Sequence, residues 1–399
     1  MAWTEACDNG TFRVRFRRND GTIGSIPDFT DEESAGTYIA DMKTDQRRNV
    51  WVDPTTQQTL LGTFAEPGWI DSLDVDQRTE ENYRSFLKVH IMPKWKNYPL
   101  PEITNLKARV WKKELHALGL APSTVDSIMK CFSMLLSDAA DENLLPANPI
   151  RKPRRGRRQR PQRRVRQIWS ESDDVLAIAD QAALVYGPGA ALLIVTAAWT
   201  GLRWGELTGL DRINVHLFDD DTGKIVIDPD FGCLHEPCKG AMFLGPPKTN
   251  SSVREVSLPP FLVRLLRAHL ATHAHRHVFV TPDGALHRRS NFARRAFRLA
   301  ADGNTHILDA PIRLRAVKPG LKFHGLRHSH KTWMISDGIP EIAQALRLGH
   351  ELKDKVQQTY SHVARAVEER LLDLLQARWE KAVAGSATPA EQSTWRCAA

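Results

Sequence analysis

Apolar and polar residues alternate with a period of two near the start of the chain. The stretch TFRVRFRR at residues 11–18 places three apolar side chains on one side and Arg13, Arg15 and Arg17 on the other. This alternation is typical of a β-strand with one buried face. The NDG sequence at 19–21 has the residue types of a tight turn, so the pattern predicts a hairpin.

A helix is expected to follow this hairpin. Thr30 and Glu33 have the spacing of a capping box, which predicts a helix from Thr30 to about Asn49. We therefore expect residues 1–66 to form a small domain in which a β-sheet packs on one helix. Its exposed arginines could enter the major groove of DNA. The alternative is an edge strand whose charges prevent aggregation.

From residue 67 to residue 150 the apolar residues recur with helical spacing. Those between 83 and 91 form one stripe, in a helix that is expected to begin at Thr79. Further helices are expected over 103–118 and from residue 122 onward. The pattern of this segment predicts an all-α domain.

The next segment, 151–167, combines a lack of apolar periodicity with a high positive charge. It contains ten Lys or Arg residues and no acid, so the net charge of +8 leaves about −2 for the rest of the chain. Such a segment cannot bury a core and is expected to be an extended linker. Its charge favours a polyanionic partner; the alternative is a solvated linker with no fixed partner. The candidate DNA-binding residues here are Arg154, Arg155, Arg157 and Arg158.

Residues 168–382 return to helical patterns, with strand-like pieces at 224–228 and 254–259. We expect a larger, mostly α domain there, followed by a flexible tail at 383–399. The chain as a whole is therefore expected to be mainly α with small β elements.

Composition limits the compartment and the kinds of site. Five scattered cysteines do not form a disulfide framework, and the first residues lack the pattern of a secretory signal. The longest apolar run, at 190–199, is half the length of a membrane span. We expect a cytoplasmic protein with no membrane partner, no metal and no cofactor. Cys233, His235 and Cys238 suggest a metal site only weakly, because a second ligand pair at recognised spacing is missing.

The stretch TGLRWGEL contains the first residue that could bind a phosphate. Arg203 is expected at the start of a helix, where a cation is unfavourable unless an anion binds there. Glu206, one turn later, could hold its guanidinium. Taken alone, a structural Arg–Glu pair explains these two residues better.

Lys248 is a second candidate. It is expected at the mouth of a hairpin whose tip is the polar turn 249–252, from where it could reach a neighbouring cleft. A lysine beside a turn is usually only solvated. The preceding segment, 211–248, is long and carries three aspartates at 219–221, so Lys239 remains an alternative to Lys248.

The stretch KFHGLRHSH places His324 and Arg327 one helical turn apart, so both can face one spot. Arginine can bind two phosphate oxygens, and histidine exchanges protons near neutral pH. Gly349 is expected to end a later helix, which fixes His350 just beyond it. Tyr360 follows ten residues after His350, on an expected helix where a tyrosine is usually part of the core.

Six of these residues, in this order and spacing, resemble the active site of the tyrosine recombinases, the phage integrase family. They are Arg203, Lys248, His324, Arg327, His350 and Tyr360. The resemblance covers nearly the whole chain. Residues 67–150 are similar to the all-α (SAM-like) core-binding domain, and 168–382 to the mixed, mostly α catalytic domain. Residues 1–66 resemble the arm-type DNA-binding domain of integrases from phages and integrative elements. The interval from His350 to Tyr360 is slightly long for the family.

The resemblance implies a nucleophile and a phosphate clamp. Tyr360 would attack a DNA phosphodiester and form a 3′-phosphotyrosyl intermediate. Arg203 and Arg327 would bind the nonbridging oxygens as negative charge builds on them.

It also implies three further roles. His350 would donate a hydrogen bond to the phosphate, Lys248 would protonate the leaving 5′-oxygen, and His324 would assist proton transfer. His328 and His330 are not in the family's core set and are expected to pack behind the site.

Physical chemistry supports this interpretation independently. Phosphodiester cleavage needs positive charge, either from metal ions or from fixed cations. The sequence has no carboxylate cluster suited to magnesium and no GxxxxGK[ST] phosphate loop, whereas it has ordered arginines, lysines and histidines. We therefore expect a site-specific recombinase that integrates or excises a mobile element without metal or ATP.

The expected partners are double-stranded DNA, at core and arm sites, and further copies of the chain in a homotetramer on DNA. A host DNA-bending protein and an excisionase are further candidates. The helix from Ala366 to Ala382 could pack on a neighbouring protomer. One alternative is a non-catalytic DNA-binding regulator, because 338–360 has some helix-turn-helix character. Another is a type IB topoisomerase, which uses similar chemistry but has no need of an arm-type domain.

Overall fold

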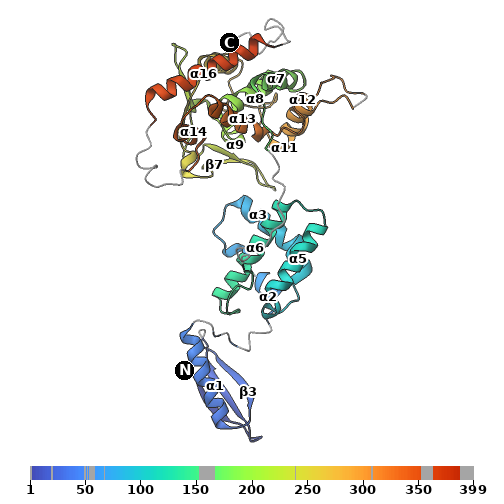
Figure 1. The fold of residues 1–399 in the computed structure, drawn as a ribbon, viewed down its shortest axis with the longest axis vertical. Coiled ribbons are helices and arrows are strands. Elements are labelled where there is room, and N and C mark those ends of the chain that lie inside the picture. The colour runs from blue at the N-terminus through green and yellow to red at the C-terminus, as the bar shows by residue number, and fades with distance from the viewer. Residues whose placement is uncertain are drawn as a thin grey trace. The chain divides into compact units, whose positions relative to one another are not determined.

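The computed structural model describes residues 2–18, 21–48, 51, 53, 59–66, 68–151, 167–238, 240–306, 309–351 and 363–386. The chain folds as two compact units, Met1–Pro161 and Gln162–Ala399. Short antiparallel strands accompany many helices, which confirms the expected mainly α fold with small β elements (Figure 1). The finer division at 66, 150, 167 and 382 stays a prediction. The predictions that fall outside the described residues concern Asn19, Asp20, Arg154, Arg155, Arg157, Arg158, Lys239, Tyr360 and the tail from 387 onward.

The first unit begins with a three-stranded antiparallel sheet covered by one helix. The strands β1 (Ala2–Ala6), β2 (Phe12–Arg17) and β3 (Ile23–Phe29) lie in that order, and α1 (Glu32–Arg47) packs against them. Val14 and Phe16 are buried, as the alternation predicts. The expected capping box at Thr30 is wrong. Asp31 is the N-cap, and its carboxylate, which suits the positive helix end better than a hydroxyl, accepts from the backbone N–H of Ser34.

The arginines of β2 lie on the opposite face of the sheet, where one carboxylate neutralises part of their charge. Glu5 of β1 accepts from Arg13 Nη2 at 3.2 Å and from Arg15 Nε at 2.5 Å. The hydrogen bond from Arg15, together with the charge of Arg13, lowers the pKa of Glu5. Within the described ranges, Arg17 forms no ion pair.

The rest of the first unit is a helical bundle. Its segments are α2 (Leu61–Ala65), η2 (Ile70–Ser72), α3 (Gln77–Phe86), the π-turn η3 (Leu87–Ile91), α4 (Met92–Trp95), η4 (Leu100–Glu102), α5 (Asn105–Ala117) and α6 (Pro122–Asp141). The helix α3 begins before the expected Thr79, because the Asp76 side chain caps it by accepting from the Thr79 N–H at 2.9 Å. Trp95 lies in the centre of the bundle, stacked on Phe132 with ring centroids 5.2 Å apart.

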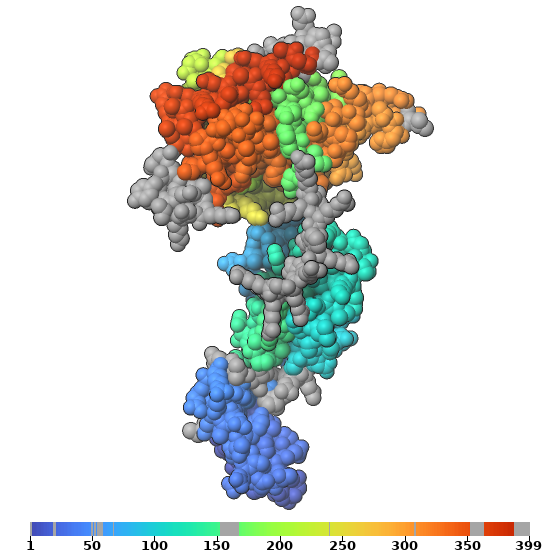
Figure 2. All heavy atoms as spheres, viewed as in Figure 1, coloured from blue at the N-terminus to red at the C-terminus, as the bar shows by residue number. Residues whose placement is uncertain are grey.

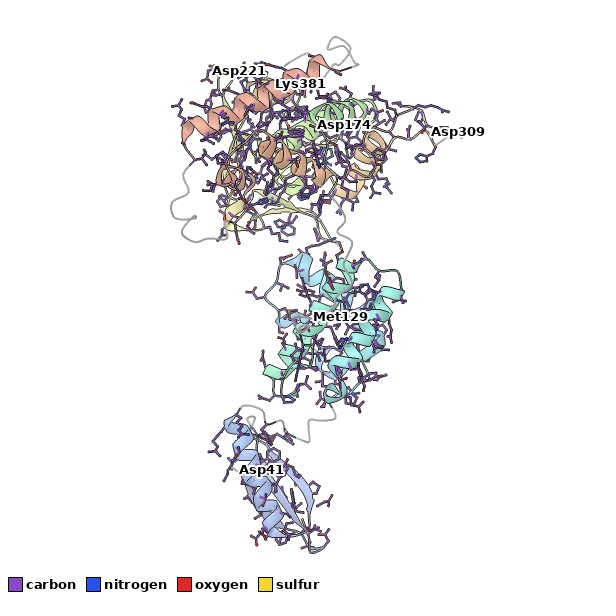
Figure 3. The ribbon with its side chains drawn as sticks, viewed as in Figure 1. Asp41, Met129, Asp174, Asp221, Asp309 and Lys381 are labelled. Atoms are coloured by element: carbon purple, nitrogen blue, oxygen red, sulfur yellow. The ribbon has the colours of Figure 1, made fainter. Side chains whose placement is uncertain are left out.

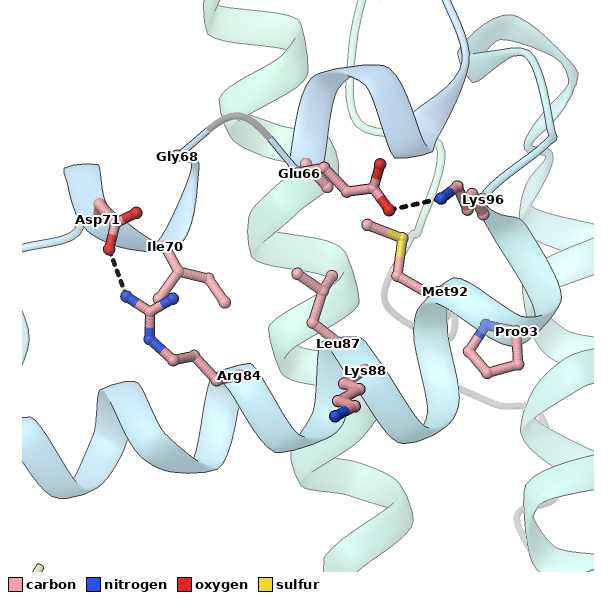
Figure 4. A pocket seen from close by; sticks show the side chains of 11 residues that line it. Glu66, Gly68, Ile70, Asp71, Arg84, Leu87, Lys88, Met92, Pro93 and Lys96 are labelled. Atoms are coloured by element: carbon pink, nitrogen blue, oxygen red, sulfur yellow. Dashed lines mark hydrogen bonds and ion pairs between the residues drawn. The ribbon is translucent and has the colours of Figure 1, made fainter. Parts of the chain in front are cut away.

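A surface pocket of about 480 Å³ lies beside α2, α3 and α4 of this bundle (Figure 4). Apolar side chains such as Leu87 form its floor. An ion pair flanks it on each side, Glu66 with Lys96 at 2.6 Å and Asp71 with Arg84. None of the candidate residues lines this pocket.

The second unit packs helices around two small sheets. Its helices are α7 (Ser172–Tyr186), α8 (Pro188–Thr200), α9 (Trp204–Thr208), η5 (Arg212–Asn214), η6 (Asn250–Ser252), α10 (Pro260–Ala271), α11 (Arg289–Phe292), the π-turn η7 (Ala293–Phe297), α12 (Arg298–Asp302), α13 (Phe323–Ser336), α14 (Glu341–Leu348) and α16 (Arg365–Ala384). Its strands are β4 (Val215–Leu217), β5 (Gly223–Val226), β6 (Cys233–His235), β7 (Phe243–Gly245) and β8 (Glu255–Ser257). One sheet has the order β4-β5-β8, and β6 pairs with β7 in the other.

The helix α8 is the centre of this unit. All its residues from 190 to 200 are buried, and it packs against α7, α10 and α13. A helix that is apolar on every side belongs inside a domain. The C-terminal helix α16 covers the same core (Figure 2). The Trp379 ring stacks on Phe261 with ring centroids 4.2 Å apart, and the Trp199 indole donates to the Leu375 carbonyl. One face of α16 therefore packs on the core of its own domain, and the packing of this helix on a neighbouring protomer stays a prediction.

The two expected strands of this unit are confirmed, but their connection differs from the prediction. The segments 224–228 and 254–259 overlap β5 and β8, which pair with each other. The expected hairpin with its tip at 249–252 is wrong, because β7 pairs with β6 and the turn η6 connects two separate sheets. The aspartates at 219–221 lie in the β4–β5 turn, and Figure 3 labels Asp221. Asp221 pairs with Arg264 and Arg267 of α10.

Two kinds of feature are missing from the described part of the chain. None of its helices is long and apolar enough to cross a bilayer. In the same ranges, no three His, Cys, Asp or Glu side chains are grouped as metal ligands would be. The Cys233 thiol is half-buried on β6, and burial raises its pKa to about 11.

Two histidines lie inside the second unit. His330 is fully buried and His287 is 3% exposed. Burial lowers the pKa of His287 to about 4 and that of His330 well below its ordinary value, because the charged imidazolium would lose its hydration. Both side chains are therefore neutral in the folded protein at neutral pH.

We predict that the second unit loses stability as the pH falls from about 6.5 to about 4. The unfolded chain protonates its histidines near pH 6.5, whereas folded His287 resists protonation down to about pH 4. Unfolding therefore takes up protons in this window, which lowers the free energy of unfolding by roughly 3 kcal/mol for His287 at the acid end. Denaturant titrations across this pH range measure the effect, and His287→Gln should reduce it. An unfolding midpoint that does not change with pH would contradict the explanation.

Candidate active site

The structure brings four of the six candidate residues together in the second unit. Arg203 directly precedes α9 as its N-cap, His324 and Arg327 lie on α13, and His350 follows α14. They are close enough for the charge of Arg203 to lower the pKa of the other three side chains. Lys248 is exposed in the loop after β7.

The turn between α8 and α9 positions Arg203. Gly201 ends α8 with φ +69°, a left-handed conformation that glycine adopts without strain. A larger residue at position 201 would also clash, because its Cβ would lie 2.6 Å from Cδ2 of Leu348. Arg203 is the N-cap of α9, and its backbone N–H and Nη1 donate to Glu206 at 2.9 and 2.8 Å. The expected contact between Arg203 and Glu206 is confirmed.

Three arginines converge on the C-terminus of α14, where three successive backbone carbonyls each accept a hydrogen bond from a different guanidinium. The pairs are Arg254 with the Arg347 carbonyl at 2.7 Å, Arg327 with Leu348, and Arg203 with Gly349 at 3.0 Å. These carbonyls lack partners within the helix and lie at the negative end of its dipole, so both effects favour a cation. We call this arrangement the carbonyl clamp.

The same helix end fixes His350. Gly349 has φ +62°, and the backbone N–H groups of Gly349 and His350 bond back to Leu346 and Ala345 in a Schellman motif. His350 therefore lies directly beyond the carbonyl clamp, at the place that the LGH sequence predicts.

Arg327 is held from a second side. Its Nη1 donates to the Gly201 carbonyl at 2.6 Å, and the residue is only 5% exposed. Burial, together with the neighbouring charge of Arg203, lowers the pKa of Arg327 to about 9. The guanidinium remains charged at neutral pH, and an anion beside it would raise this pKa again.

Among the described residues, Glu206 is the one carboxylate that bonds to these arginines. It is 1% exposed, and Arg254 contacts it at 3.0 Å in addition to Arg203. Burial alone would raise the pKa of Glu206, but the two arginines outweigh it and hold the pKa below its ordinary value. Three arginines and one ionised carboxylate leave an excess of two positive charges. Such an excess in a partly buried place favours the binding of an anion.

The two candidate histidines are neutral in this environment. Burial lowers the pKa of His324 and of His350 to about 4, and neighbouring cations such as Arg327 contribute. The His324 ring also packs edge-on against His328, with centroids 4.9 Å apart. A neutral imidazole carries one N–H, so each ring can donate one hydrogen bond to a phosphate oxygen.

Lys248 is connected with these residues only through its loop. Thr249 hydrogen-bonds to the Ser252 hydroxyl at 3.0 Å, and this hydroxyl accepts from Arg203 Nη1 at 2.8 Å. The ammonium group of Lys248 itself forms no hydrogen bond or ion pair with any residue that the structure describes. The loop is therefore anchored at the site while the lysine extends into solvent.

Arg254 is a residue of this site that the sequence analysis missed. It lies at the start of the predicted strand 254–259, and nothing in that short pattern separates it from an ordinary surface arginine. Only the fold places it between Glu206 and the end of α14, 7% exposed at its side chain.

A group of arginines on the segment α11–η7–α12 was missed as well. The exposed members, none of which forms an ion pair within the described ranges, are Arg289, Arg294, Arg295 and Arg298. Glu236 accepts from the backbone N–H of Arg289 at 2.9 Å and from the Trp204 indole at 2.5 Å, which ties α11 to α9. The signal was available, because RRSNFARRAFR contains five arginines in eleven residues.

Taken together, these groups can bind a phosphodiester and stabilise charge that develops on it. Two fixed guanidiniums match the oxygens of a phosphate, and neutral imidazoles supply further donors. Because their partners on the protein side are mostly backbone carbonyls, the positive charge remains available to an anion.

Comparison with known proteins points to the family that the sequence motifs resemble. The model of the phage integrase family matches residues 162–366. A protein of Mycobacterium tuberculosis that is named as the integrase of prophage phiRv2 is 25% identical over 382 residues, which cover 92% of this chain and 93% of that protein. The ICEBs1 integrase of Bacillus subtilis is 24% identical and covers 77% of this chain and 80% of its own length.

Solved structures share the fold. The integrase of the transposon Tn1549, in complex with circular intermediate DNA, has a TM-score of 0.59 at 13% identity over 81% of this chain and 99% of that one. Lambda integrase, as a tetramer bound to a Holliday junction, has a TM-score of 0.51 at 17% identity over 88% of this chain and 96% of that one. The chain belongs to the phage integrase family and is a tyrosine site-specific recombinase.

Proposed function

We propose that this recombinase binds double-stranded DNA and that Tyr360 attacks a phosphodiester held by Arg203, Arg327 and His350. The observation that carries the proposal is the carbonyl clamp, which holds both guanidiniums immediately beside His350. Attack by the phenol oxygen forms a 3′-phosphotyrosyl bond and breaks the bond to the 5′-oxygen. The energy of the phosphodiester is conserved in the new bond, so religation needs no ATP.

The proposed charges match this reaction. The phosphate gains negative charge as the fifth oxygen approaches, and the two arginines bind the nonbridging oxygens on which it develops. The excess of positive charge around Glu206 supports this role. His350, neutral before DNA binds, donates a further hydrogen bond to the phosphate.

Two proton transfers accompany the displacement. We assign the proton of the Tyr360 phenol to a path assisted by His324, and the protonation of the leaving 5′-oxygen to Lys248. The anchored loop of Lys248 supports this assignment, since its Ser252 contacts Arg203. Lys239 stays the alternative donor.

The remaining basic residues are proposed to bind the duplex. The sheet domain 1–66 would contact an arm site through Arg13, Arg15 and Arg17, while 67–150 and 168–382 would enclose the core site. The linker arginines would follow the phosphates between them, as would the arginines of α11–η7–α12. The four exposed arginines of this segment, without ion pairs in the described ranges, support binding of a polyanion near it.

The assembly proposed for this chain is a homotetramer that joins two duplexes in order to integrate or excise a mobile element. The tetramer of lambda integrase on a Holliday junction supports this by its likeness in fold. A host DNA-bending protein and an excisionase are the further partners proposed, and the cytoplasm is the proposed compartment.

We predict that Tyr360→Phe abolishes cleavage and leaves DNA binding intact. A nicked duplex that carries the end sequence of the mobile element traps the covalent protein–DNA adduct, because the short 5′ strand diffuses away. Wild-type protein should accumulate the adduct, and Tyr360→Phe should bind the duplex with unchanged affinity but form none. An adduct at another residue would overturn the proposal. Strand exchange between two duplexes, measured with the intact site, separates a recombinase from a topoisomerase.

We predict that Lys248→Ala slows cleavage of ordinary DNA and that a sulfur leaving group restores the rate. A thiolate leaves without protonation, so replacing the 5′-bridging oxygen by sulfur removes the need for a general acid. The matched variant Lys239→Ala should cleave both substrates at the wild-type rate. Rescue of Lys239→Ala in place of Lys248→Ala would exchange the two assignments.

We predict that replacing Arg154, Arg155, Arg157 and Arg158 by Glu weakens DNA binding and flattens its dependence on salt. Each lost phosphate contact should reduce the slope of log K against log [salt] by about 0.9. Fluorescence anisotropy over a series of salt concentrations measures this slope. The control with Lys at the same positions should keep the wild-type slope. An unchanged slope in the Glu variant would mean that the linker only spaces the domains.

A further inference from the structure

Arg347 carries a buried charge that the proposed reaction does not use. It lies in the last turn of α14, is 7% exposed, and is one of the few buried charged residues of the described chain. Burial lowers its pKa to about 10, which leaves the guanidinium charged at neutral pH. A buried cation is costly unless it is paired or needed in its place. The nearby charge of Glu368 offsets part of this cost, but in the described structure no carboxylate is in hydrogen-bond contact with Arg347, which bonds to neutral acceptors instead.

Three acceptors surround this guanidinium, and each comes from a different element. Arg347 Nε donates to Nε2 of His330 on α13 at 3.0 Å. Its Nη1 donates to the Ser257 carbonyl of β8 at 3.1 Å, and its Nη2 to the Trp199 carbonyl of α8 at 3.2 Å. One side chain therefore connects four elements of the second unit.

Two of these contacts, and Arg347 itself, lie within four residues of a candidate catalytic residue in the sequence. Trp199 precedes Arg203 by four residues, at the C-terminus of α8. His330 follows Arg327 by three residues on the same helix, and Arg347 itself precedes His350 by three. The contacts of Arg347 with Trp199 and His330 therefore join the segments that bear Arg203, Arg327 and His350.

We propose that Arg347 is a positioning residue, which through His330 and the carbonyls of Trp199 and Ser257 sets the relative places of Arg203, Arg327 and His350. The proposal rests on the proposed function, because it concerns the geometry of the same phosphate site. Arg347 does not bind the phosphate; it fixes the helix ends from which the carbonyl clamp and His350 extend.

The chemistry of His330 explains why the acceptor is an imidazole. Nε2 accepts from Arg347, so the ring is neutral with its proton on Nδ1. A carboxylate in this place would add a negative charge behind Arg327 and reduce the excess positive charge that an anion requires. An apolar side chain would leave Nε of Arg347 buried without a partner. A neutral acceptor avoids both effects, and His330 is packed closely here, since a Cβ on Gly201 would lie 2.8 Å from its Cδ2.

The test measures the cleavage step separately from DNA binding and from stability. With the full-length chain and the nicked duplex described above, Arg347→Met should lower the single-turnover cleavage rate at saturating DNA by roughly 100-fold, the effect of a misplacement of about 1 Å. Its affinity for the same duplex should stay unchanged, because Arg347 lies behind the site.

Arg212 provides a matched control. Its guanidinium also caps a helix, by donating to the His273 carbonyl at 2.7 Å and to the Leu270 carbonyl at the end of α10. That helix carries none of the candidate residues. Arg212→Met should lower the melting temperature as Arg347→Met does, but should cleave at the wild-type rate below that temperature.

Variants of His330 keep the test decisive if Arg347→Met fails to fold. His330→Phe removes the acceptor and should slow cleavage, whereas His330→Gln supplies an amide oxygen near the place of Nε2 and should retain most of the rate. If His330→Phe, His330→Gln and wild type cleave at equal rates, the positioning role is overturned. It is also overturned if Arg347→Met and Arg212→Met lose cleavage rate to the same extent. If wild-type protein forms no adduct at all, the proposed function fails instead.

Discussion

The candidate site depends on the C-terminus of α14, whose backbone carbonyls bind arginine side chains. The last carbonyls of α14 each hold a guanidinium, and two of these belong to the candidate residues Arg203 and Arg327. A carbonyl binds a guanidinium less strongly than a carboxylate does, but it fixes the direction of the side chain without cancelling the charge. Only Glu206, among the described residues, offsets part of that charge. This constraint lets the fold build a rigid site that is still strongly positive.

The rest of the second unit supplies the rigidity that this arrangement needs. The fully buried helix α8 fixes the turn from which Arg203 extends, and Gly201 allows α14 to approach that turn closely. The buried guanidinium of Arg347 joins the same elements from behind. The aromatic contact of Trp379 on Phe261 holds α16 against the same core. A candidate site made from distant parts of the sequence therefore rests on one continuous core.

Sequence alone predicted the elements and the local positions of the site, since these follow from periodicity and turn chemistry. The place of Arg203 at a helix start and of His350 beyond Gly349 could be read directly from short motifs. The pairing of strands that are distant in the sequence could not be predicted in this way. A polar turn at 249–252 has the same residue types whether it closes a hairpin or connects two sheets, so the pairing of β7 and β8 was predicted wrongly. Arg254 and Arg347 were not recognised for a related reason. An arginine in a strand or helix pattern is usually exposed, and only the tertiary packing buries these two side chains.

The contact of Glu5 with Arg13 and Arg15 bears on how such a protein would find its target. With one carboxylate against three arginines, this face of the sheet presents a weaker field to a random stretch of duplex than its sequence suggests. Non-specific affinity grows with the number of phosphates neutralised. If the sheet binds DNA as proposed, its affinity would therefore depend less on salt than a count of its arginines suggests.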